Sequence, residues 1–414
     1  MTETANVPPR SDPERGSAKP RGSAPLHVLT LTPFYPSEED DAAGCFVSEP
    51  LDALAAYGVV NTVFALQTFY RRKLRARDSG ATARWLRYFS WPGSAGLPAA
   101  GAFAFARIVS QVRELQRSHQ IDLIHAHAPL PSGHAAMLLS AELGIPYVVS
   151  VHGLDVFSTG QTASRAGEWS RRLSQRVYRS SRRVICVSEH VRELVLEGMR
   201  RSCRTSVVYN GVDPELFSPG SEAGSEGKSE AASGDPLILS VGNLIPIKGH
   251  DLLIRAVGAL VSEFPRISLE IIGDGPEHGS LRALAQQLQI LDRVHFAGRQ
   301  SRRQVADAMR RCTVFALPSR YEGLGCVYLE AMSVGKPVIG CRGQGIAEII
   351  RHGSNGFLVG PDNEKELTLA LAMLLRDDQR RRNLGAVARD TILERLTLTH
   401  QAENLARMYR ESVG

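Results

Sequence analysis

The chain of 414 residues is longer than one ordinary hydrophobic core, so its length predicts two domains. Apolar residues make up 43% and charged residues 22% of the composition, as in soluble globular proteins, and no apolar run reaches the roughly 20 residues that a membrane span needs. The net charge of +6 attracts polyanions, but no recognisable nucleic-acid-binding module accompanies it, which argues against nucleic acid as a partner.

The N-terminal segment and the cysteines both bear on the compartment. Residues 1–24 are polar, contain Pro, Gly and Ser, and lack the basic start and apolar core of a secretory signal. We therefore expect a disordered tail and no secretion. The six cysteines are scattered without a CxxC pair, so neither a zinc site nor a disulfide framework is predicted, and we expect reduced thiols.

Short apolar runs that end in Gly, Pro, Ser or His recur along the chain and predict β-strands. They lie at residues 26–31, 59–66, 122–127, 147–151, 183–188 and 205–210, and then at 237–242, 268–273, 294–298, 314–318, 337–341 and 356–360. Nearly continuous apolar runs are typical of strands that are covered on both faces. Segments with helical spacing, such as 251–264 and 364–378, separate most of them, so we predict two Rossmann-like domains with six parallel strands each.

A low-complexity segment separates the two halves. Residues 220–234 contain no large apolar side chain and predict a flexible insert at the domain boundary. The expected organisation is a first domain over 25–212, a hinge with this insert over 213–235, a second domain over 236–395, and a final helix over 396–414 that can cross back to the first domain.

Basic residues are concentrated in the first half. Residues 1–212 carry 25 Lys and Arg against 18 Asp and Glu, whereas the remainder carries 24 against 25. Two clusters stand out, namely Arg71, Arg72, Lys73, Arg75 and Arg77, and then Arg171, Arg172, Arg176, Arg179, Arg182 and Arg183. They are either solvated helix faces or surfaces that attract phosphates or acidic lipid, and the second interpretation predicts peripheral association with a membrane.

Two glutamates follow the fourth predicted strand of the second half, at the sheet edge where ligands of open parallel sheets bind. Glu322 lies in the loop after the strand, and Glu330 interrupts the otherwise apolar helical string CVYLEAM. A carboxylate there is costly unless it meets hydrogen-bond donors, and an ionised carboxylate suits the vicinal hydroxyls of a ribose or a pyranose. Taken singly, either glutamate would be a helix cap or a solvated side chain.

The string around these glutamates resembles the EGxGxxxLEAMxxGxPV signature of glycosyltransferase family 4. The matching residues are Ser319, Glu322, Gly323, Gly325, Leu329, Glu330, Ala331, Met332, Gly335, Pro337 and Val338. The resemblance implies a two-domain GT-B fold and a reaction that retains the anomeric configuration of the sugar. It also implies that Glu330 holds the nucleotide ribose and that Glu322 approaches the hydroxyls of the donor sugar.

The turn after the strand at 337–341 is suited to the donor diphosphate. At Gly343, Gln344 and Gly345, bare backbone N–H groups and a helix N-terminus predict a phosphate cradle. The family usually has two adjacent glycines at this turn, whereas here Gln344 separates them.

Lys248 stands between a strand and a helix, where its ammonium can neutralise the leaving diphosphate. Family members commonly carry an arginine in the position that Asn243 occupies here. One fixed charge on the diphosphate is therefore missing. Either a basic residue elsewhere replaces it, with Arg320 as a candidate, or stabilisation of the leaving group is weaker.

The first half supplies candidate residues for the opposite side of the cleft. His152 and Asp155 follow the strand at 147–151 in a string that resembles the family's HGxD. An imidazole can donate a hydrogen bond to a sugar hydroxyl, and a carboxylate can orient polar partners. Gly44 resembles the N-terminal loop glycine that lets the backbone approach the donor phosphates, and residues 209–219 resemble the interdomain hinge.

No metal site is predicted, and no cofactor is expected apart from the nucleotide diphosphosugar as donor substrate. His125 and His127 share one face of a strand, but no third ligand lies near them in the sequence. The acidic loop at 38–41 lacks the spacing of a metal-binding DxD, so we interpret it as a solvated loop.

These features predict a cytoplasmic, retaining glycosyltransferase with peripheral association at the inner face of the membrane. It would move a sugar from a UDP- or GDP-sugar to a glycan or lipid-linked glycan in polysaccharide or envelope synthesis. Two alternatives stay open. A catalytically weak sugar-nucleotide-binding protein is supported by Asn243, whereas the EGxGxxxLEAM string argues against a GT-B nucleotide-sugar epimerase.

Overall fold

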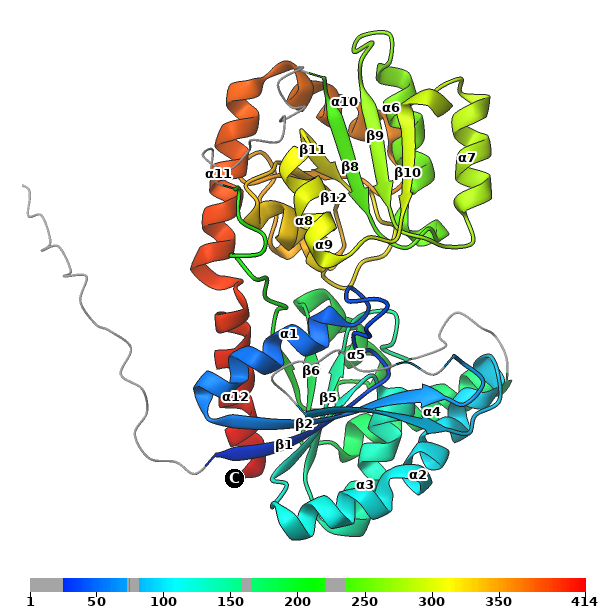
Figure 1. Ribbon diagram of the computed structural model, residues 1–414, viewed down its shortest axis with the longest axis vertical. Coiled ribbons are helices and arrows are strands. Elements are labelled where there is room, and N and C mark those ends of the chain that lie inside the picture. Colours follow the sequence, from blue (N-terminus) through cyan, green and yellow to red (C-terminus); the bar gives the residue numbers. More distant parts are fainter. Residues whose placement is uncertain (1–24, 73, 75–81, 158–164, 221–234) are drawn as a thin grey trace, which may run out of the picture.

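The computed structural model describes residues 25–72, 74, 82–157, 165–220 and 235–414. The predicted tail at 1–24 and nearly all of the predicted insert at 220–234 lie outside these residues. The chain forms two α/β halves along the longest axis of the molecule, each built around a parallel sheet (Figure 1).

The first half contains a parallel sheet of seven strands in the order β3-β2-β1-β4-β5-β6-β7. These strands are β1 (Leu26–Thr32), β2 (Val59–Thr68), β3 (Thr82–Tyr88), β4 (Leu123–His127), β5 (Tyr147–Val151), β6 (Arg183–Cys186) and β7 (Thr205–Val207). The prediction of six strands is wrong for this half, because it missed β3. This strand lies at the sheet edge and reads TARWLRY, in which exposed arginines interrupt what would otherwise be an apolar run.

The second half contains a parallel sheet of six strands, the predicted number, in the order β10-β9-β8-β11-β12-β13. They are β8 (Leu237–Val241), β9 (Ser268–Ile272), β10 (Val294–Gly298), β11 (Val314–Ala316), β12 (Val338–Cys341) and β13 (Phe357–Val359). In both sheets the strand order reverses beside the first strand of the half, so a crevice opens at the carboxyl ends of the strands.

Helices cover both faces of each sheet. In the first half they are α1 (Cys45–Leu54), α2 (Leu97–Ser118), α3 (His134–Leu143), α4 (Arg165–Ser180) and α5 (Glu189–Gly198). In the second half they are α6 (His250–Leu260), α7 (His278–Gln287), α8 (Arg302–Arg311), α9 (Cys326–Ser333), α10 (Glu364–Arg376) and α11 (Asp378–Arg395). Buried apolar side chains of α6, α7 and α10 form one core with the second sheet, and those of α8, α9 and α11 pack on its other face.

The last helix, α12 (Leu398–Val413), packs against the first half although it follows the second half in the sequence (Figure 1). Its Tyr409 is fully buried, and the Tyr409 hydroxyl lies 2.6 Å from Nδ1 of His125 in β4. Between α11 and α12 the chain passes from the second half back to the first. There, Val212 exchanges backbone hydrogen bonds of 2.9 and 3.0 Å with Leu396 and Leu398. The two passages of the chain between the halves therefore run side by side.

Across the described ranges, every helix is too short or too polar to cross a membrane.

Candidate active site

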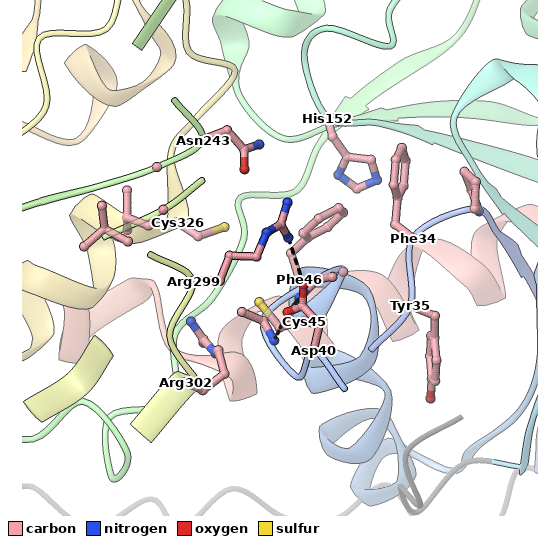
Figure 2. Close-up of a pocket in the computed structure, with 18 of the residues that line it drawn as sticks. Phe34, Tyr35, Asp40, Cys45, Phe46, His152, Asn243, Arg299, Arg302 and Cys326 are labelled. Carbon is pink, nitrogen blue, oxygen red and sulfur yellow. Dashed lines mark hydrogen bonds and ion pairs between the residues drawn. The ribbon is translucent and has the colours of Figure 1, made fainter. Parts of the chain in front are cut away.

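A cleft of about 850 Å³ lies at the carboxyl ends of the strands of both sheets. Gly44 and His152 from the first half contribute to its wall, as do Asn243, Lys248 and Glu330 from the second. In the close-up, His152 and the neighbouring phenylalanines lie opposite the loops that carry Asn243 and Arg299 (Figure 2). Residues predicted from separate motifs are thus brought to one cavity.

Lys248 and Glu322 form an ion pair on the cleft wall. Lys248 ends a short 3₁₀ helix, Pro246–Lys248, that follows β8, and Glu322 lies in the loop after β11. The Lys248 Nζ lies 2.5 Å from Oε2 of Glu322, and only 18% and 12% of the two side chains are exposed. Lys248, predicted to bind the diphosphate, and Glu322, predicted to bind the donor sugar, are therefore in direct contact.

Glu330 is buried at the base of the cleft, in the second turn of α9. The helix starts after Gly325, whose φ of 84° and lack of a capping side chain leave the first amides of α9 without a side-chain partner. One carboxylate oxygen of Glu330, Oε1, accepts a hydrogen bond from Arg302. The other, Oε2, is buried and has no partner among the described residues. An ionised oxygen in that position requires a donor, which a hydroxyl of a bound ligand can supply.

The turn at Gly343, Gln344 and Gly345 does not match the predicted cradle in this conformation. The N–H of Gly345 donates to the carbonyl of Glu322 at 3.0 Å, and the side-chain oxygen of Gln344 accepts from the N–H of Glu322 at 2.9 Å. Of the described residues that line the cleft, none comes from this turn. A Cβ on Gly345 would lie 1.8 Å from the carbonyl oxygen of Gly323, so this glycine is required for close packing of the two loops. The turn orients the Glu322 loop.

The charge missing at Asn243 is not replaced by Arg320. The Arg320 guanidinium binds both carboxylate oxygens of Asp251 at 2.9 Å and Asp362 at 2.6 Å, away from the cleft wall. The guanidinium groups on the wall belong instead to Arg71 of the first half and, in the second half, to Arg299 after β10 and Arg302 at the start of α8. The last two were not predicted, because an arginine in a polar stretch has no sequence pattern that separates a site residue from a solvated one.

His152 and Asp155 have different positions relative to the cleft. His152 lines the cavity, with its ring 4.7 Å from that of Phe46 and 6.1 Å from that of Phe34. Asp155 instead holds the loop, because its Oδ1 accepts hydrogen bonds of 2.8 Å from the N–H groups of His152 and Gly153. Asp155 was predicted as catalytic, and this geometry makes it a positioning residue for His152.

Three histidines lie together at the cleft: His152 is half-buried on its wall, and His125 and His127 are buried behind it. Nε2 of His152 lies 3.1 Å from Nδ1 of His127, and the ring of His127 packs 4.2 Å from that of His125. Burial lowers the pKa of His152 below its usual range, against the opposing effect of Asp155, and lowers the pKa of His125 to about 3. His152 is therefore a neutral imidazole at pH 7, able to accept or donate a hydrogen bond according to its tautomer.

Gly44 brings the backbone before α1 to the cleft wall. Its φ is 76°, and a Cβ there would lie 2.5 Å from the backbone of Phe34 and Tyr35, so a side chain is excluded both by conformation and by space. The acidic loop that precedes it is not simply solvated, contrary to our expectation. Asp40 forms an ion pair of 2.9 Å with Arg299, and Oδ1 of Asp41 accepts the N–H of Arg302 at 3.1 Å. The loop therefore joins the two halves beside the cleft.

Within the described ranges, no group of three or more His, Cys, Asp or Glu side chains is arranged to hold a metal ion. All six cysteines are free.

Two family models match the chain. The model described as "Glycosyltransferase Family 4" matches residues 47–216, and the model described as "Glycosyl transferases group 1" matches residues 224–391. Together they span both halves of the structure.

Relatives and solved structures agree with this match. An uncharacterized glycosyltransferase of Methanocaldococcus jannaschii is 31% identical over 66% of this chain and 71% of its own length. A D-inositol 3-phosphate glycosyltransferase of Stackebrandtia nassauensis is 29% identical over 98% of this chain and 96% of its own length.

Two solved structures have the same fold. Sucrose-phosphate synthase from Thermosynechococcus elongatus superposes with a TM-score of 0.77 at 22% identity, over 93% of this chain and 98% of the other. Anabaena HepE in complex with UDP superposes with a TM-score of 0.71 at 21% identity, over 93% and 100% of the two chains. The GT-B fold expected from the sequence is confirmed.

Proposed function

This chain belongs to glycosyltransferase family 4, and from that premise we propose that it moves a sugar from a UDP- or GDP-sugar to an acceptor with retention of the anomeric configuration. Family membership identifies a glycosyltransferase rather than the epimerase or the weak binding protein considered above. A nucleotide sugar as donor is supported by the structure of the Anabaena neighbour, which was solved with UDP.

The observation that carries the proposal is the unpaired oxygen of Glu330. This carboxylate is 2% exposed at the base of the cleft, and its Oε2 has no partner among the described residues. A ribose hydroxyl of the donor nucleotide would supply the missing hydrogen bond. The first amides of α9 lie on the same wall, at Gly325 and Cys326, where the helix dipole favours a negatively charged group.

Lys248 and Glu322 would then act on the two parts of the donor that meet at the scissile bond. The Lys248 ammonium would stabilise the departing diphosphate, and Glu322 would accept hydrogen bonds from hydroxyls of the sugar. His152, neutral and held by its loop, would position the sugar from the opposite side of the cleft.

The chemical step needs no covalent enzyme intermediate. The bond between the anomeric carbon and the phosphate oxygen breaks, the acceptor oxygen bonds to that carbon on the same face, and the acceptor proton passes to the departing diphosphate. The contribution of the protein would be orientation and electrostatic stabilisation.

Release of UDP or GDP in the presence and absence of acceptor tests the proposal. We expect release that depends on acceptor, and a product that keeps the donor's anomeric configuration. Inverted product would contradict the retaining mechanism, and release of the same size without acceptor would show hydrolysis rather than transfer.

We further propose that the acceptor is a glycan or lipid-linked glycan and that the first half contacts the inner membrane surface. Exposed aromatic rings at the ends of β2 and β3 support this, since the ring of Phe89 lies 5.2 Å from the rings of both Phe69 and Trp91. Helix α4 adds the exposed ring of Trp169 and a row of exposed arginines, namely Arg171, Arg172, Arg176 and Arg179. Aromatic rings and basic side chains on one surface favour an anionic lipid interface. Six free thiols are typical of a reducing compartment such as the cytoplasm.

Sedimentation with vesicles tests the membrane proposal. Wild type should bind vesicles of phosphatidylglycerol but not those of phosphatidylcholine. This binding should be lost in Trp91→Ser and retained in Leu369→Ser, which removes another exposed apolar side chain, from the second half. Equal sedimentation of the two variants would contradict the proposal that the first half contacts the membrane.

A further inference from the structure

Arg302 is shared by two carboxylates that come from different halves of the molecule. Its Nη1 donates to Oε1 of Glu330 in α9. Its Nε and Nη2 donate to the two oxygens of Glu49 in α1, at 2.9 and 3.0 Å, which is a bidentate pairing. The proposed nucleotide-binding carboxylate is thus connected, through one guanidinium, to a helix of the opposite domain.

The position of this guanidinium is fixed by its surroundings. Only 10% of the Arg302 side chain is exposed, and its Cζ lies 4.7 Å from the centre of the Phe217 ring. The N–H of Arg302 is also held by Asp41. A buried guanidinium with three fixed neighbours determines where its hydrogen-bond partners can lie, because its donors have a rigid planar geometry.

The consequence for Glu330 is that its two oxygens are not equivalent. Arg302 occupies Oε1 and so restricts the orientation of the carboxylate, while Oε2 has no partner among the described residues. We propose that Arg302 and Glu49 are positioning residues for the nucleotide ribose: Glu49 holds Arg302, and Arg302 holds Glu330 in the orientation that accepts a ribose hydroxyl. The inference rests on the ribose role proposed for Glu330, and it assigns nucleotide selectivity to a residue of the acceptor domain.

Discrimination between ribonucleotides and deoxynucleotides isolates this role. A positioning defect at Glu330 lowers the contribution of the ribose hydroxyls and leaves contacts to the base and the phosphates in place. A general structural defect weakens every nucleotide alike. We therefore compare the dissociation constant of UDP with those of its 2′-deoxy and 3′-deoxy analogues, and do the same for GDP. The ratio of these constants separates a positioning defect from a general structural defect.

The experiment compares wild type with Glu49→Gln by calorimetry. This change keeps the size of the side chain but weakens the bidentate ion pair. We expect the preference for the ribonucleotide to fall at least fivefold, through weaker binding of UDP or GDP and little change for the deoxy analogue. Arg302→Lys, which keeps the charge but not the planar fork, should show the same loss. Glu39→Gln is the control, because Glu39 is exposed and its ion-pair partner among the described residues is the exposed Arg72, at 3.2 Å.

The outcomes distinguish this inference from the function on which it rests. If wild type prefers the ribonucleotide and Glu49→Gln and Arg302→Lys keep the full preference, the positioning role is wrong and the ribose role of Glu330 stands. If wild type binds the deoxy analogues as tightly as the ribonucleotides, for both UDP and GDP, the ribose role of Glu330 is wrong. The inference about Arg302 and Glu49 is then wrong as well. Parallel melting curves verify that each variant is folded.

Discussion

The ammonium of Lys248 lies 2.5 Å from a carboxylate oxygen of Glu322, and the hydroxyl of Ser319 lies 3.4 Å from the same oxygen. Each charge is therefore compensated by the other. A donor that brings two phosphate charges would draw Lys248 toward the diphosphate and leave Glu322 to pair with hydroxyls of the sugar. The pair thus holds both side chains at the position where the scissile bond would lie.

Replacing Lys248 by alanine should lower kcat by about 10²-fold, the scale observed when a single stabiliser of a developing negative charge is removed. In the proposed mechanism, the leaving diphosphate would lose the ammonium that stabilises it from the cleft wall. Steady-state kinetics with saturating donor check this, with Lys365→Ala as a control that removes an exposed lysine from the same domain. A Lys248→Ala enzyme with wild-type kcat would exclude the leaving-group role.

Replacing Glu330 by alanine should weaken the binding of UDP or GDP by about 1.5–3 kcal/mol, the range for a hydrogen bond to a charged group. The chain should remain folded, because Arg302 keeps its bidentate partner Glu49. Calorimetry gives the affinity, and a melting curve gives the stability. Affinities equal to those of wild type would contradict the ribose contact.

Replacing Glu322 by alanine should instead reduce turnover while nucleotide affinity is largely kept, because Glu322 is proposed to contact the sugar and not the nucleotide. The ratio of kcat for variant and wild type, measured beside the dissociation constant for free UDP or GDP, gives the answer. A loss confined to UDP or GDP binding would assign Glu322 to the nucleotide.

Transfer should proceed in an excess of EDTA, because Lys248 and the N-terminus of α9 supply positive potential at the proposed diphosphate site. The check is the initial rate with and without chelator. Activity that vanished in EDTA and returned with Mg²⁺ or Mn²⁺ would contradict this prediction. It would make Asp40 and Asp41, in the acidic loop beside the cleft, candidate metal ligands.

The stability of the protein should fall as the pH is lowered from 6.5 toward 5. Burial lowers the pKa of His125 to about 3, whereas an unfolded histidine takes up a proton near pH 6.5, so each unit below 6.5 favours the unfolded chain by up to about 1.4 kcal/mol through this residue. His127, whose pKa burial also lowers, acts in the same direction. Melting temperatures at pH 7, 6 and 5 should decline less steeply in His125→Gln than in wild type. The exposed His119→Gln variant should keep the wild-type slope.

Apolar patterning predicted most of the fold. Continuous runs such as residues 147–151 and 237–242 became buried parallel strands, because a strand covered on both faces needs apolar side chains in both directions. The missed strand, β3, lies at the sheet edge and carries two exposed arginines, Arg84 and Arg87, which point to opposite faces because successive side chains of a strand alternate. These polar residues interrupt the apolar run, so a search for continuous apolar runs misses the strand.

The candidate site was predicted unevenly, for a related reason. Glu330, Lys248, His152 and Gly44, which were predicted from local strings or positions that resemble those of the family, all lie on the cleft wall. Their long-range partners were not predicted. The bonds of Arg302 to Glu49 join residues 253 positions apart, and that kind of contact exists only once the two halves have met.

The position of α12 makes the first half depend on the end of the sequence. Tyr409 and Leu405 complete the apolar core on one face of the first sheet, together with α1. During synthesis the strands β1 to β7 leave the ribosome first, yet the helix that covers them follows about two hundred residues later, behind the whole second sheet. The half that is made first is thus finished last. A fragment cut at the hinge would expose an uncovered sheet face, so the first half alone would have to be produced with α12 joined to it by a new linker.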